Sequence, residues 1–331
     1  MGAYLKFNAL LRAVALLAVM AFVALAADPG IPIPPASEVN DQKPGSVLFY
    51  SYFTSSSSSQ VSQDTRISIT NINTSSNVAI HLFFVDGTTC STVDNFICLT
   101  ENQTKSFLAS DLNPGVTGYL IAVAVDGTTG CPVSFNFLLG DASVRLSSGH
   151  RAEFSAEAIA ALYTGVLSGC GLTLATLNFD GASYNQIPRA LALDKIGSAV
   201  DQNSTLLVVN RVGGNLTAGA SPLGPLFGIL YGDTRDPHSF TLDPQTCQLA
   251  GILSNNFIRT TPPFQTVIPA GLTGWMKLWA ADDVGIFGVA INFNENAAYN
   301  RSAFGGGDNL HKLTLSTTNS LIIPVIPPSC W

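Results

Sequence analysis

Two tryptophans flank a lysine in Trp275–Trp279, and these residues form the best candidate binding site. Side chains alternate between the faces of a strand, so Trp275, Lys277 and Trp279 would share one face, with the indoles about 13 Å apart. Lys277 indicates that this face is at least partly wet. Such rings can stack on sugars or dock a partner protein. The alternative, which the pattern favours, is packing between domains, with the lysine stem lying over apolar surface.

Residues suited to acid–base or nucleophilic chemistry are few and scattered. The four histidines are His81, His150, His238 and His311, and none lies in an HxH or HExxH pair. His150, Glu153 and Glu157 could align on one helix face and hold a metal, but a solvated helix face is the simpler interpretation. No GxSxG motif or recognisable carboxylate pair occurs. The sequence therefore predicts a protein that is not an enzyme, although catalytic groups can come together from distant positions.

Two polar clusters could ligate calcium. They are Asp308 with Asn309, and the set Asn292, Asn294, Glu295 and Asn296. Neither cluster has EF-hand spacing. We therefore predict no cofactor, with calcium as the alternative.

Six cysteines follow the N-terminal region: Cys90, Cys98, Cys131, Cys170, Cys247 and Cys330. An even number in an exported chain predicts disulfides, and no CxxC motif suggests zinc. Pairing Cys90 with Cys98 would close a short polar loop. Cys131–Cys170 and Cys247–Cys330 then follow by order, although other connectivities remain open.

The first residues have the pattern of a secretory signal peptide. Lys6 and Arg12 supply positive charge, and Ala13–Leu25 is apolar but short for a membrane span. Ala24–Ala26 fits a small-x-small cleavage site. We therefore predict a signal peptide over residues 1–27, cleaved near Ala26, and a secreted or cell-surface protein. A retained anchor is the alternative.

The charge balance restricts the partners. The chain carries 15 Lys and Arg against 22 Asp and Glu, a net charge of −7, and has no basic cluster. Such a chain is poorly suited to bind nucleic acid or anionic membranes. No later segment is apolar enough to span a membrane. The expected partners are a protein or glycan at the cell surface, or further copies of the chain.

The segment Gly115–Phe137 recurs as Gly271–Phe293 at a constant offset of 156 residues, with eight of 23 aligned positions identical. This is a duplicated supersecondary unit. Each copy predicts a β-hairpin. In the first copy, the strand Leu120–Val125 is followed by a turn at Asp126-Gly127 and by an alternating return strand through Phe137.

The remaining pattern predicts an all-β chain with strands at Ser46–Thr54, Arg66–Ile72 and Asn77–Val85 among others. We expect two tandem immunoglobulin-like β-sandwich units related by the repeat, with one short helix, Ala152–Tyr163, between them. The Cys…Trp…Cys arrangement of true immunoglobulin domains is absent, so only the architecture is predicted. The expected segments are a proline-rich lead-in over 28–45, unit 1 over 46–142, a connecting region over 143–203 and unit 2 over 204–331.

Several stretches carry a resemblance: PGSVLFYSYFT, DTRISITNIN, HLFFVDGTTC and TGWMKLWAADD. With them the chain resembles uncharacterised secreted bacterial proteins with immunoglobulin-like repeats, a resemblance that implies no activity. The leading hypothesis is an exported, non-enzymatic protein of surface structure, adhesion or extracellular assembly. One alternative is a glycan-binding module built on the tryptophan face. Another is a secreted hydrolase with an unrecognised site, placed in Ser143–Asn203.

Overall fold

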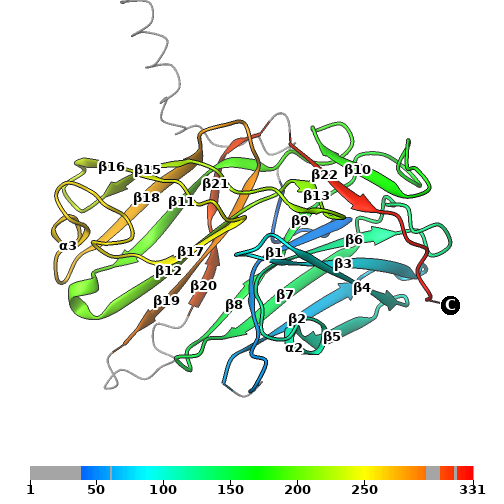
Figure 1. Ribbon diagram of the computed structural model, residues 1–331, viewed down its shortest axis with the longest axis horizontal. Coiled ribbons are helices and arrows are strands. Elements are labelled where there is room, and N and C mark those ends of the chain that lie inside the picture. The colour runs from blue at the N-terminus through cyan, green and yellow to red at the C-terminus, as the bar shows by residue number, and fades with distance from the viewer. Residues whose placement is uncertain (1–38, 60–61, 296–305, 317–318, 331) are drawn as a thin grey trace, which may run out of the picture. The chain divides into compact units, whose positions relative to one another are not determined.

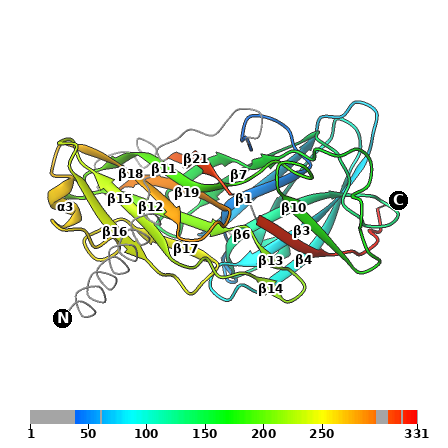
Figure 2. The same cartoon turned by 90° about the horizontal axis from the view of Figure 1, so that it is seen from above.

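The computed structural model of the protein describes residues 39–59, 62–295, 306–316 and 319–330 (Figures 1 and 2). The described residues belong to one compact unit, Pro32–Trp331. The signal peptide predicted over residues 1–27 lies outside the described residues. Within the described ranges, no helix is long and apolar enough to cross a membrane.

This unit consists of small sheets joined by loops. Sheets A and B contain strands from the earlier part of the chain. Sheet A has the order β4 (Thr92–Leu99), β3 (Val78–Asp86), β6 (Thr117–Val125), β1 (Val47–Thr54) and β9 (Glu157–Ile159). Sheet B has the order β5 (Thr104–Leu108), β2 (Asp64–Asn71), β7 (Leu138–Arg145) and β8 (Arg151–Ser155). The strand pairs in both sheets are antiparallel.

Sheets C and D contain strands from the later part of the chain. Sheet C has the order β16 (Pro237–Leu242), β15 (Leu226–Tyr231), β18 (Thr273–Ala280), β11 (Pro188–Gly197) and β21 (His311–Leu315). Sheet D has the order β17 (Gln248–Ile252), β12 (Asn203–Arg211), β19 (Ile286–Asn294) and β20 (Gly306–Asn309). Sheets A and C have the same topology, because their strands follow one spatial order when they are ranked by position in the chain. The same holds for sheets B and D.

Sheet E and the short helices complete the unit. Sheet E has the order β10 (Leu174–Phe179), β22 (Asn319–Pro324), β13 (Gly214–Asn215) and β14 (Gly219–Ala220). The helical elements are α2 (Ala109–Leu112), α3 (Phe264–Val267) and the 3-10 turn η3 (Ala199–Asp201).

Three apolar clusters hold the sheets together. Strand β1 is buried on both faces because an apolar cluster covers each face. Its side chains alternate, so that Leu48 and Tyr50 belong to a cluster with sheet B, whereas Val47 and Phe49 belong to one with sheet E. The third cluster joins sheets C and D, and includes Met276 of β18. Burial of this apolar surface is the main stabilising contribution to folding.

This arrangement confirms the all-β class but corrects the predicted architecture. Two tandem immunoglobulin-like sandwich units with a helix between them are not formed. The described strands form five small sheets instead. A five-bladed β-propeller has the same number of sheets, so the arrangement is propeller-like. Most of these sheets also combine strands that are distant in sequence, such as β1 with β9 and β10 with β22.

The helix predicted over Ala152–Tyr163 is wrong. The segment forms β8 and β9, with Ala152 and Phe154 buried while Glu153 and Ser155 are exposed. The residues therefore have the two-residue period of a strand. Pairing with β7 and β1 overrides the helix propensity of alanine and glutamate.

The repeated segment forms a strand in both copies but not a hairpin. β6 pairs with β1 and β3 in sheet A, whereas the following strand, β7, pairs with β2 and β8 in sheet B. In the later copy β18 likewise lies in sheet C and β19 in sheet D, but β19 includes the predicted return strand Val289–Phe293, whereas Val133–Phe137 of the first copy forms no strand. The turn predicted at Asp126-Gly127 is present in the first copy, where the Asp126 N–H donates to the Cys131 carbonyl and Val125 bridges Pro132. The chain then crosses to sheet B, and a turn signal alone does not predict that crossing.

Two disulfides link separate segments of the fold. Cys131 pairs with Cys170, as predicted, and Cys98 of β4 pairs with Cys330 near the C-terminus. The pairings Cys90–Cys98 and Cys247–Cys330 are therefore wrong. Cys90 and Cys247 carry free thiols in the structure.

Candidate functional site

The outer face of sheet C carries an unusual concentration of aromatic side chains. Strand β18 buries Met276 against sheet D, so Trp275 and Lys277 project from the opposite face. The neighbouring strand β15 is in register, with Tyr231 opposite Trp275 and Phe227 opposite Trp279. Cross-strand partners share a face. We call Phe227, Tyr231, Trp275 and Lys277 the aromatic face.

Tyr231 and Trp275 form a stacked pair at one end of the β15–β18 pairing. Their ring centroids are 4.3 Å apart and their planes differ by 8°. The Lys277 Nζ lies 5.6 Å from the Trp275 centroid and 6.0 Å from that of Tyr231. These distances lie within the range of a cation–π attraction. Because Nζ is almost equally distant from two rings stacked 4.3 Å apart, the ammonium lies beside the stacked pair. The indole of Trp275 remains 37% exposed.

Trp279 does not contribute the exposed surface that the binding hypothesis requires, and its burial agrees with packing, the alternative that the pattern favours. It is 4% exposed, and its ring centroid lies 6.4 Å from that of Phe227 in a tilted arrangement. Phe227, at 37% exposed, is the outer aromatic residue of this cross-strand pair. A platform of two exposed tryptophans is therefore not formed. The structure brings Trp275 and Lys277 together with Tyr231 and Phe227, which sequence reasoning missed.

Hydroxyl groups border the aromatic face on the side of β16. Ser239 lies opposite Ile229 of β15, and Thr241 lies opposite Phe227. Both residues are exposed. A hydroxyl both donates and accepts hydrogen bonds, so this edge adds polar partners beside the apolar rings.

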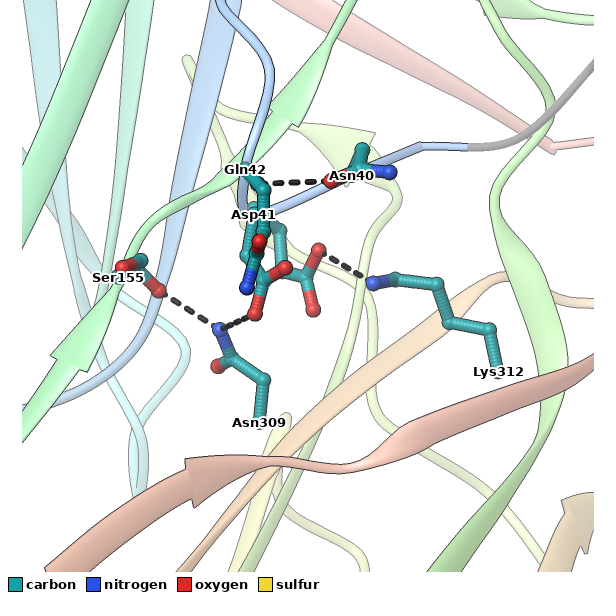
Figure 3. A network of polar contacts seen from close by, with 7 residues as sticks. Asn40, Asp41, Gln42, Ser155, Asn309 and Lys312 are labelled. Atoms are coloured by element: carbon teal, nitrogen blue, oxygen red, sulfur yellow. Dashed lines mark hydrogen bonds and ion pairs between the residues drawn. The ribbon is translucent and has the colours of Figure 1, made fainter. Parts of the chain in front are cut away.

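A separate polar network joins the region around Asn40 to β20 and β21 (Figure 3). The Asn309 side-chain amide donates to Asp41 Oδ2 at 3.2 Å and to the Ser155 carbonyl at 2.8 Å. Lys312 Nζ lies 2.8 Å from Glu157 Oε2, and the two side chains are 11% and 1% exposed. A polar pocket of about 420 Å³ adjoins this network. The contacts connect sheets A, B, C and D, which assigns the network a structural role.

The predicted calcium ligands do not converge. The oxygens of Asn292 and Glu295 accept hydrogen bonds from Thr205 and Ser204, each at 2.7 Å, and Asn309 turns its nitrogen toward Asp41. Asn296 lies outside the described residues. Among the described residues, no group of three or more His, Cys, Asp or Glu is placed to hold a metal.

The predicted metal ligands His150, Glu153 and Glu157 each make separate contacts. Glu153 is exposed on β8, Glu157 pairs with Lys312, and His150 lies buried against Phe293 with centroids 4.7 Å apart. The His150 Nδ1 is 2.9 Å from the Ser148 hydroxyl, at a pocket of about 510 Å³. Its Nε2 meets the Asn294 carbonyl at 3.2 Å.

The contact between Ser148 and His150 is the nearest approach to a hydrolase site in the predicted region 143–203. In a catalytic triad, a carboxylate orients the imidazole and stabilises its charged form. Here a neutral carbonyl occupies that place. Ser148 and His150 are therefore hydrogen-bonded as a nucleophile and a base would be. They lack the carboxylate whose negative charge would stabilise a protonated His150.

Comparison with known proteins identifies no family. No protein-family model matches the chain, and no curated protein matches it. Among solved structures, a chain from "Cowpea mosaic virus top component (CPMV-T) - naturally occurring empty particles" aligns at 9% identity with a TM-score of 0.16. The alignment covers 92% of this chain and 96% of that chain. A TM-score this low carries no argument about fold or function.

Proposed function

We propose that the chain is an exported, non-enzymatic adhesion protein that binds neutral oligosaccharides through the aromatic face. The observation that carries the proposal is the stacked Tyr231–Trp275 pair beside Lys277 on the outside of sheet C, in which Tyr231 is half-buried and Trp275 is exposed. An exported destination agrees with the two disulfides.

The chemistry of the face favours a sugar over other ligands. One face of each stacked ring is covered by the other, so a sugar would contact the outer face of Trp275 or Tyr231. The negative π surface of such a face attracts the slightly positive C–H groups of a pyranose ring. The Lys277 ammonium and the Ser239 and Thr241 hydroxyls supply hydrogen bonds for sugar hydroxyl groups at the edge of the rings. A net charge of −7 disfavours polyanionic ligands, so the expected oligosaccharides are neutral.

Tryptophan fluorescence provides the test. Addition of neutral oligosaccharides to the mature protein is expected to change the emission, because Trp275 is an exposed indole in the proposed contact. The variant Trp275→Ala removes one ring of the stacked pair. Because this substitution also removes the reporting indole, its affinity is compared with that of the wild type by isothermal titration calorimetry. We expect it to bind at least about 30-fold more weakly, as for the loss of an aromatic contact worth about 2 kcal/mol.

The matched control is Phe137→Ala. Phe137 is an aromatic residue with similar exposure, 42%, but it lies outside the aromatic face. This variant should bind as the wild type does. Equal affinity of wild type and Trp275→Ala would reject the aromatic face as the binding site, and no response to any neutral oligosaccharide would reject the proposed ligand class.

A further inference from the structure

Cys90 and Cys247 come from distant parts of the chain but meet in the structure. Cys90 lies in the turn that follows β3, and Cys247 immediately precedes β17. Cys247 is fully buried in the cluster beneath sheet A, and Cys90 packs against the same cluster. The other four cysteines are paired in disulfides.

A single carbonyl group connects the two residues. The Asp86 oxygen accepts a hydrogen bond from the Cys90 backbone N–H at 2.9 Å and another from the Cys247 thiol at 3.2 Å. The Cys247 Sγ also lies 3.6 Å from the Gly87 oxygen. The Cys90 backbone and the Cys247 thiol are therefore held at the same carbonyl oxygen.

The surrounding backbone holds this approach in place. The Gln248 N–H donates to the Gly87 carbonyl at 3.2 Å, and the Gln248 side chain donates to Asn210 at 2.7 Å. The Asn210 amide in turn donates to the Ser51 carbonyl of β1 at 2.7 Å. These buried bonds fix the segment around Cys247 against sheet A, beside the turn that carries Cys90.

We propose that Cys90 and Cys247 are joined by a third disulfide in the exported protein. The bond would link the β3–β4 turn of sheet A to the start of β17 in sheet D. Rotation of the Cys247 side chain would replace its S–H···O contacts with an S–S bond to Cys90.

The oxidation requires a disulfide donor, which we take to be a small-molecule disulfide such as oxidised glutathione. The Cys90 thiolate attacks the donor, breaks its S–S bond, forms a mixed disulfide and releases one thiol. The Cys247 sulfur, after losing its proton to water, attacks the Cys90 sulfur and releases the second thiol. Two electrons and two protons leave the protein thiols, and the donor is reduced to two thiols.

Burial determines when this bond can form. Desolvation raises the pKa of the Cys247 thiol well above its usual range, and the neighbouring Cys90 raises it further. Little nucleophilic thiolate is therefore present at Cys247 in the folded protein. We expect rapid closure while the chain folds and slow closure once Cys247 is buried.

Alkylation and peptide mapping test the pairing. The mature chain is reduced, refolded in a buffer of reduced and oxidised glutathione, denatured without reductant and treated with N-ethylmaleimide. We expect no labelled cysteine and a protease fragment pair joined through Cys90 and Cys247. The variant Cys90→Ala should leave one labelled residue, Cys247, and retain the Cys98–Cys330 and Cys131–Cys170 bonds.

Label on both Cys90 and Cys247 in the wild type would overturn the proposal, whether or not the other disulfides have formed. A bond from either residue to a different cysteine would also overturn it. A double variant, Cys90→Ala with Cys247→Ala, provides a second measurement. Its melting temperature should fall by several degrees relative to the oxidised wild type, and an unchanged value would contradict a structural cross-link.

Discussion

His81 shows how burial alone can make the protein sensitive to acid. The imidazole is fully buried between Phe83 and Phe96, whose ring centroids lie 4.1 and 4.0 Å from its own. Its Nε2 lies 2.9 Å from Asp94 Oδ2, and its Nδ1 has no hydrogen-bond partner within the described part of the chain. The geometry fits a neutral ring that donates through Nε2. Protonation at Nδ1 would bury an unsatisfied N–H group.

This environment predicts the sign of a pH dependence. Desolvation lowers the pKa of His81 below its usual 6.5, and the Asp94 carboxylate offsets only part of that effect. The unfolded chain therefore binds the proton more tightly than the folded chain does. The stabilising contribution of neutral His81 is complete above pH 6.5 and is lost as the pH falls through the lowered pKa.

The test is a series of thermal melts between about pH 5 and pH 8. The wild type should lose stability below pH 6.5, and the variant His81→Phe should lose less over the same interval. Identical slopes in the two proteins would show that His81 does not cause the dependence.

The aromatic face illustrates the limit of prediction at the residue scale. Trp275 and Lys277 could be found from the sequence because they alternate on a single strand. Tyr231 and Phe227 also alternate along Leu226–Tyr231, but only the register between β15 and β18 places them beside Trp275. The burial of Trp279 likewise depends on the surrounding fold, which the alternation of one strand does not determine.

At the scale of elements, the repeated strands share a glycine with a clear steric function. A Cβ at Gly118 of β6 would lie 1.8 Å from the Val85 carbonyl oxygen of β3. At the corresponding Gly274 of β18, it would lie 2.7 Å from the Tyr231 carbonyl oxygen of β15. Both glycines therefore permit close approach of a neighbouring strand, which explains why this position is identical in the two copies.

We expect Gly118→Ala to lower the free energy of unfolding by about 3 kcal/mol or more, because a backbone carbonyl must move to admit the methyl group. Gly306→Ala is the control, since a Cβ there meets no atom within 4 Å. Urea denaturation measures both changes. Equal stability of Gly118→Ala and wild type would contradict the close packing of β6 against β3.

Several elements were predictable because their local patterns and their pairing agree. Ser46–Thr54, Arg66–Ile72 and Asn77–Val85 correspond to β1, β2 and β3 within two residues at each end. Ala152–Tyr163 failed because composition favoured a helix while the fold required alternating strands. The repeated hairpin failed because a turn motif does not specify which sheet the next strand joins.

At the scale of the whole molecule, the two observed disulfides constrain chain segments of very different length. Cys98 and Cys330 are separated by 232 residues, whereas Cys131 and Cys170 are separated by 39. Closing the longer loop removes more conformational entropy from the unfolded chain. Of the predicted pairings, only the shorter of these two is present, since order along the sequence does not determine which strands become neighbours.

We therefore expect Cys330→Ala to lower the free energy of unfolding by about 1.5 kcal/mol more than Cys170→Ala does. Denaturation of both variants under oxidising conditions measures the difference. A larger loss from Cys170→Ala would indicate that native-state contacts, rather than loop entropy, dominate the contribution of these bonds.

The central claim is that the aromatic face of sheet C binds neutral sugars. A glycan array probed side by side with the mature protein and its Trp275→Ala variant tests it most directly. The account predicts binding of the wild type to a set of neutral glycans and loss of those signals in the variant. Wild-type binding to anionic glycans alone would contradict it, as would no binding to any glycan on the array. Full retention of the signals by Trp275→Ala would also contradict it.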